Sequence, residues 1–134
     1  MDINNFKQFK NTGTKLSNHT FSINKSRSFG INSGFYHKNN IKIYKYAVLF
    51  YNDKDRSIAF LFTNDENING KFKITHSDNK TSGNITAVSF FNSYGLNIKE
   101  IVGKYNPKEI VHPEFGKIFY VTINKTVDNQ NKVE

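Results

Sequence analysis

The sequence has no cysteine and no tryptophan, and only two of its 134 residues are proline. Without cysteine the chain can form neither a disulfide nor a thiolate metal site, which fits a reducing compartment. Long apolar runs are also missing, since the longest, Tyr46–Tyr51, is far too short to cross a membrane. The first twenty residues contain no apolar segment of the kind that a secretory signal needs. We therefore expect a cytoplasmic protein of one domain with no membrane partner.

Signatures of catalysis are scarce as well. The eight glycines are scattered and form no phosphate-binding loop. None of the four histidines has a second ligand-type residue four positions away, so we predict no metal site and no cofactor. His112 and Glu114 are the one close pair of histidine and carboxylate, and Pro113 between them favours a turn rather than an acid–base site. We expect a protein that is not an enzyme.

Polar segments flank a strand-rich middle. Residues 1–18 and 125–134 are predicted to be tails, and residues 19–124 a single domain. Within the domain, short runs of alternating apolar residues are typical of strands. Two apolar runs, Ile41–Asn52 and Ser57–Thr63, are separated by polar turn formers and predict a hairpin of two central strands, covered on both faces.

The sequence of the second half of the domain has less regular patterns. Ile85–Leu96 has apolar residues at helical spacing, with Thr86 as a possible cap and Gly95 as the expected end. Asn97–Gly116 holds both prolines and is predicted to be mainly loop, with a short strand possible at Ile101–Tyr105. The side chains that we expect to be buried in the core are Leu49, Phe60, Phe62, Ile85 and Phe91.

Two segments of the domain read alike, residues 21–41 and 72–96. Each opens with Phe-x-Ile, crosses a polar turn with a glycine just before an isoleucine, and continues to an aromatic pair and a final aliphatic residue. The pattern predicts one β-β-α-β-β unit used twice, since two units related by a pseudo-two-fold axis could close a small barrel. The alternative is chance reuse of Phe and Ile in a β-rich chain. The predicted units are 20–63 and 71–123, with helices at 33–40 and 87–95.

The expected fold is therefore mainly β with two short helices (α+β), either a small barrel or a pair of packed sheets. Gly30–Phe62 resembles the half-barrel of the AbrB-type swapped-hairpin DNA-binding proteins. The matching segments are the basic turn Lys25–Ser28, the short strand Phe29–Asn32, the helical stretch Ser33–Ile41 and the hairpin Lys42–Thr63. The chain departs from that family where Ser33 or Gly34 replaces the proline that opens the helix, and where Lys42-Ile43-Tyr44 replaces Gly-Asp before the hairpin. A looser likeness links it to the Whirly-type single-strand binders.

The net charge of +8 favours a partner rich in phosphate or acidic groups, although a general abundance of lysine would give the same value. Our first hypothesis is a DNA-binding protein of regulatory or phage-like type that forms a homodimer, and we expect DNA rather than RNA. The alternative is a small protein-binding module, such as a phage-encoded inhibitor that acts on an acidic partner surface. Basic residues beside aromatic ones, in turns and on outward strand positions, are the candidate contacts. The predicted nucleic-acid-binding residues are Lys25, Arg27, Lys42, Tyr44, Lys71, Lys73 and Lys80.

Overall fold

The computed structural model describes residues 19–123, a mainly β fold with three short α-helices and one turn of 3-10 helix. The predicted tails, 1–18 and 125–134, lie outside the described residues. None of the helices in the described part is long and apolar enough to span a membrane. In chain order the elements are β1 (Phe21–Asn24), β2 (Ser28–Ile31), α1 (Ser33–Lys38), η3 (Ile41–Ile43), β3 (Tyr46–Asn52), β4 (Ser57–Thr63), β5 (Phe72–His76), β6 (Gly83–Thr86), α2 (Val88–Ser93), α3 (Ile98–Ile101), β7 (Gly103–Tyr105), β8 (Lys108–His112) and β9 (Gly116–Thr122).

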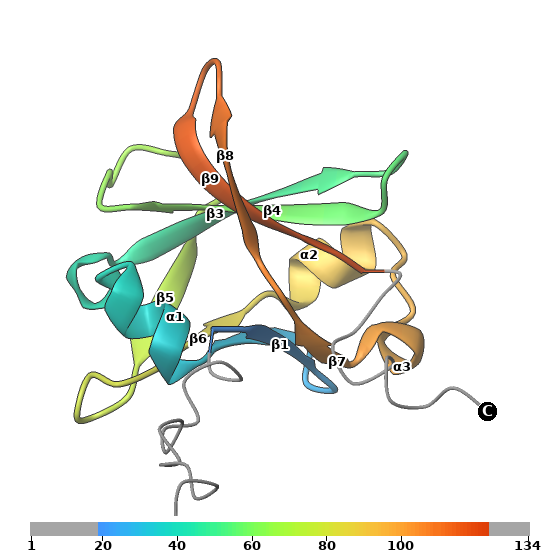
Figure 1. Ribbon diagram of the computed structural model, residues 1–134. Coiled ribbons are helices and arrows are strands. Elements are labelled where there is room, and N and C mark those ends of the chain that lie inside the picture. The colour runs from blue at the N-terminus through green and yellow to red at the C-terminus, as the bar shows by residue number, and fades with distance from the viewer. Residues whose placement is uncertain (1–18, 124–134) are drawn as a thin grey trace, which may run out of the picture.

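The nine strands form one antiparallel sheet in the order β7-β1-β2-β6-β5-β3-β4-β9-β8. The sheet curls into a barrel-like shape, with the helices at its sides (Figure 1). Its two end strands, β7 and β8, are separated in the chain only by Asn106 and Pro107, so the backbone itself links the ends of the sheet. We call β7, β1, β2, β6 and β5 the β2–β6 layer, and β3, β4, β9 and β8 the β4–β9 layer. The core lies between them.

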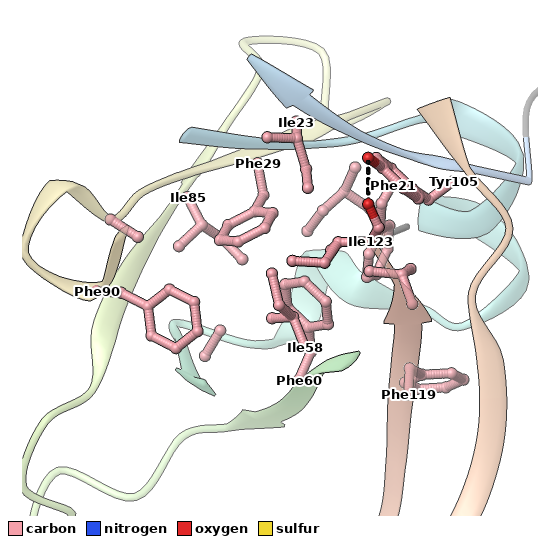
Figure 2. Close-up of a cluster of buried hydrophobic side chains, with 14 of the residues drawn as sticks. Phe21, Ile23, Phe29, Ile58, Phe60, Ile85, Phe90, Tyr105, Phe119 and Ile123 are labelled. Carbon is pink, nitrogen blue, oxygen red and sulfur yellow. Dashed lines mark hydrogen bonds between the residues drawn. The ribbon is translucent and has the colours of Figure 1, made fainter. Parts of the chain in front are cut away.

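Alternation along the strands fills this core with aromatic and branched side chains. Phe60 on β4 is fully buried, and its ring lies 4.6 Å from that of Phe21 on β1 and 4.9 Å from that of Phe29 on β2, edge to face in both cases (Figure 2). These contacts join the two layers directly. The expected burial is confirmed for Phe60, Ile85 and Phe91.

The predicted covering of the β3–β4 hairpin on both faces is wrong. Leu49 and Phe62 pack against the core but stay only partly buried. On the outer face of the hairpin, Phe50 and Leu61 are only partly buried. Phe115, from the turn between β8 and β9, covers part of Phe50, with 5.0 Å between ring centres. Long apolar runs on both faces of a strand therefore did not mean complete enclosure here.

The first two α-helices lie where the sequence predicts them but are shorter than predicted. Helices α1 and α2 lie inside the predicted segments 33–40 and 87–95. Gly95 has φ +60° directly after α2, as expected for a residue that ends a helix. The prediction of Thr86 as the cap of this helix is wrong, because Thr86 ends β6 and the N-cap is Ala87. Ile85, included in the helical pattern, also belongs to β6, where it faces Phe29.

The prediction of a mainly irregular Asn97–Gly116 is also wrong. The Asn97 side chain accepts a hydrogen bond from the Lys99 amide and starts helix α3, the third α-helix rather than the expected total of two. Strands β7 and β8 then pair with β1 and β9. The short strand given as possible at Ile101–Tyr105 is present as β7, and its partners on β1 lie about eighty residues earlier in the chain.

Candidate nucleic-acid interface

The outward face of the β2–β6 layer is made of small polar side chains. Because the Phe and Ile residues of these strands point into the core, the residues between them point outward. Strand register aligns five outward positions in one row across the layer. With about 4.8 Å between neighbouring strands, the row is about 19 Å long. Its members are Lys104, Ser22, Gly30, Asn84 and Thr75.

A groove with a volume of about 410 Å³ lies along this face. Ser22, Asn84 and Thr75 line it together with Asn24 from the edge of the same face. A Cβ atom added at Gly30 would lie 3.5 Å from the Ser22 Cβ, an ordinary contact. The glycine therefore keeps the middle of the groove open without being required by the backbone.

Cationic turns lie beside the groove. Lys25 and Arg27 belong to the turn between β1 and β2, which the Arg27 amide closes by donating to the Asn24 carbonyl at 3.0 Å. Lys80 belongs to the turn between β5 and β6, which the Lys80 amide closes by donating to the Ser77 carbonyl at 2.9 Å. Lys25 and Lys80 are exposed, and the buried Arg27 Nε has no hydrogen-bond partner among the described residues.

These two turns lie at opposite ends of the layer. Ser28, the first residue of β2, pairs with Thr86 at the end of β6, whereas Ile31 pairs with Gly83 at its start. The strand rise of about 3.4 Å per residue then separates Arg27 from the second turn by at least about 14 Å. The sequence therefore identified cations of one layer, but the structure places them as two groups at its ends.

Of the three remaining predicted lysines, one lies on this face and two do not. Lys73 is exposed on β5, on the same outward side as Thr75, and extends the basic face. Lys71 points elsewhere: its Nζ donates to the Ile68 carbonyl at 3.2 Å and lies 5.2 Å from the centre of the Tyr46 ring. Lys42 is exposed on η3, outside the β2–β6 layer.

The predicted contact Tyr44 and the nearby Tyr36 and Tyr46 all have partners within the fold, so none is a free surface for base stacking. Tyr36 is buried, and its hydroxyl is 2.7 Å from the Nδ1 of His76. Tyr44 packs against Phe62 with 6.1 Å between ring centres. The Tyr46 hydroxyl donates to Glu66 at 2.7 Å, and this hydrogen bond, together with the charges of Lys45 and Lys71, holds the pKa of the Glu66 carboxyl below its usual value.

Lys104 is the basic residue on this face that sequence reasoning missed. It lies on β7 directly opposite Ser22 and is exposed. Its position between Gly103 and the buried Tyr105 fits a strand with one outward side chain. The sequence therefore contained a hint of Lys104, but the strand that carries it was predicted only as a possible short strand within a loop.

Charge is distributed unequally between the two layers. With its two turns, the β2–β6 layer carries five cations and one carboxylate: Lys25, Arg27, Lys73, Lys80 and Lys104 against Asp78. With its two hairpin turns, the β4–β9 layer carries four of each: Lys54, Arg56, Lys108 and Lys117 against Asp53, Asp55, Glu109 and Glu114. Counted over their strands and turns, one layer is therefore basic and the other neutral.

The described residues contain no group of three histidine or carboxylate side chains that could hold a metal ion. No protein-family model, curated protein or solved structure matches the chain.

Proposed function

We propose that this protein binds DNA through the outward face of the β2–β6 layer. The observation that carries the proposal is the unequal charge of the two layers, with the cations of one layer arranged around a groove of small polar side chains. Cations on such a surface neutralise backbone phosphates and gain free energy from the counterions that are released. A regulatory role fits a small binding protein of this kind.

Double-stranded DNA suits this face better than a single strand. None of the outward strand residues in the layer is aromatic, and single-strand binders depend on aromatic side chains that stack on unpaired bases. Serine, threonine and asparagine side chains can instead donate to and accept from base edges in a groove of the duplex. The cationic turns would contact the phosphates on either side.

We also propose that residues 20–63 and 71–123 are two copies of one unit, as in an AbrB-type barrel with both halves in one chain. Strand pairing supports this: β2 pairs with β6, each the second strand of its unit, and β4 pairs with β9, each the last strand of its unit. The second unit has one strand and one α-helix more than the first, β7 and α3. Helices α1 and α2 follow β2 and β6 in the same way. The proposed face is complete in one chain, so the possible homodimer is not needed to form it.

The test is a fluorescence-anisotropy titration of a short random-sequence duplex over a range of salt concentrations. Lys25→Ala/Arg27→Ala should lower the slope of log K against log salt by about two, since each lost phosphate contact removes about 0.9. Lys54→Ala/Arg56→Ala is the matched control, because it removes one lysine and one arginine from an exposed turn of the neutral layer, with Arg56 at φ 52° and Arg27 at φ 60°. The control should keep the wild-type slope.

Absence of salt-dependent binding by the wild-type protein to any duplex at low ionic strength would refute DNA binding. Equal losses in the two double variants would show that net charge, not this face, is responsible. If an acidic protein rather than DNA bound the face, the alternative of a protein-binding module would replace the proposal.

A further inference from the structure

The two turns beside the groove share an unusual backbone. Each is closed by a hydrogen bond from its fourth residue to its first, and each has its fourth residue in the left-handed region, Arg27 at φ 60° and Lys80 at φ 57°. That conformation costs a residue with a Cβ atom about 1–2 kcal/mol and normally favours glycine or asparagine. Arg56 in the turn of the neutral layer has the same conformation at φ 52°, so the strain is common to three cationic turns. The two turns beside the groove are distinguished instead by the charges that they carry.

The turns are also placed nearly symmetrically about the groove. Gly30 faces Asn84 at the centre of the β2–β6 pair, with Phe29 opposite Ile85 on one side and Ile31 opposite Gly83 on the other. A two-fold axis through the Gly30–Asn84 pair exchanges β2 with β6. It brings the turn that leads into β2 close to the place of the turn that leads into β6, with a shift of one residue, because Arg27 lies three residues before Gly30 and Lys80 lies four before Asn84.

The charges of the two turns differ at one position. The first turn reads Lys25-Ser26-Arg27 and the second Asp78-Asn79-Lys80, so the second residue of each hydrogen-bonded turn is charged, with opposite sign. Counted along the strands, Asp78 lies one residue farther from the Gly30–Asn84 pair than Lys25 does. The first turn carries two positive charges, whereas those of the second cancel. On the basis of the proposed function, we infer that the face holds two unequal half-sites and that Lys25 and Asp78 fix the orientation in which a duplex is bound.

This inequality has a chemical consequence for the ligand. Phosphates are attracted to the first turn, whereas the Asp78 carboxylate repels a phosphate and can accept a hydrogen bond from the amino group of cytosine. Asp78 thus favours a base edge at its end of the groove. The preferred duplex has no two-fold symmetry, although the strands that contact it are nearly symmetric.

The absence of cysteine makes orientation directly measurable. A single cysteine placed at Ser26 or Asn79, both exposed at the centres of the two turns, can carry an iron chelate that cleaves nearby DNA. The probe is a duplex selected from a random pool by the wild-type protein. We expect the chelate at Ser26→Cys to cut one end of this duplex and the chelate at Asn79→Cys to cut the other.

The charge exchange Lys25→Asp/Asp78→Lys leaves the net charge unchanged and should reverse the two cleavage ends. The matched exchange Asp53→Lys/Lys54→Asp, on the exposed turn of the neutral layer, should leave them as in the wild type. Asp78→Lys alone should raise the salt slope by about one, because it adds a phosphate contact.

The outcomes separate this inference from the proposed function. Cleavage of both ends by each probe would mean that the duplex binds in both orientations and would overturn the inference while DNA binding stands. A fixed orientation that the charge exchange fails to reverse would equally remove Lys25 and Asp78 from this role. Failure to select any duplex, with no salt-dependent binding, would overturn the proposed function itself.

Discussion

Phe60 provides the sharpest test of the packing between the two layers. Its side chain is fully buried, and its ring contacts Phe21 and Phe29 edge to face at 4.6 and 4.9 Å. Truncation of a buried phenylalanine to alanine costs about 3–5 kcal/mol, and each aromatic pair adds about 0.5–1.5 kcal/mol beyond its buried area. Because Phe60→Ala removes two such pairs and opens a cavity between β4 and the β1–β2 hairpin, we expect a loss in the upper half of that range.

The assay is urea denaturation followed by circular dichroism, with the free energy of unfolding taken from transitions of unchanged slope. Phe115→Ala is the control, since Phe115 is 40% exposed and contacts Phe50 on the outer face, 5.0 Å between ring centres. It should cost far less than Phe60→Ala. Phe60→Leu keeps most of the volume and should fold even if Phe60→Ala does not. A loss below about 1 kcal/mol for Phe60→Ala would refute the proposed packing.

Two further predictions concern polar groups inside the fold. The His76 Nε2 lies 2.8 Å from the Tyr44 carbonyl, which can only accept, so in the neutral imidazole Nε2 donates there and Nδ1 accepts from the Tyr36 hydroxyl. His76→Ala should therefore lower the free energy of unfolding by about 1–3 kcal/mol in a denaturant titration, and this loss should be smaller in a Tyr36→Phe background. Burial raises the pKa of Tyr105 to about 12, against about 10 in the unfolded chain, so the folded state keeps a proton that the unfolded chain loses. The free energy of unfolding should then fall between about pH 10 and 12, and a Tyr105→Phe variant whose pH profile runs parallel to the wild type would contradict this.

Local patterns in the sequence predicted the parts of the fold that depend on neighbouring residues. Alternating Phe and Ile gave strands β1, β2 and β5, and the polar turn at 53–56 gave the β3–β4 hairpin. Pairing between distant segments was not visible in the same way. Strands β7 and β8 form by pairing with β1 and β9. Their own sequences, which are separated by Asn106 and Pro107, contain no strong strand signal.

The candidate face was predictable in its residue types but not in its arrangement. Lys25, Arg27, Lys73 and Lys80 follow from outward strand positions and turns. The sequence could not show that Lys71 turns toward Tyr46, because this depends on the loop before β5 and on the tertiary position of β3. Tyr44 looked like an exposed platform beside two lysines, yet its ring covers Phe62 at the edge of the core.

The distribution of charge bears on whether the basic character of this protein is functional. A general excess of lysine, produced by composition alone, would raise the charge of both layers alike. Instead the carboxylates of the β4–β9 layer balance its cations one for one, whereas the β2–β6 layer has a single carboxylate, Asp78, among its strands and turns. That carboxylate lies in one of the two turns beside the groove, at the position that Lys25 holds in the other. Because composition alone would not favour one layer over the other, the contrast between the layers supports the proposed binding through the β2–β6 face.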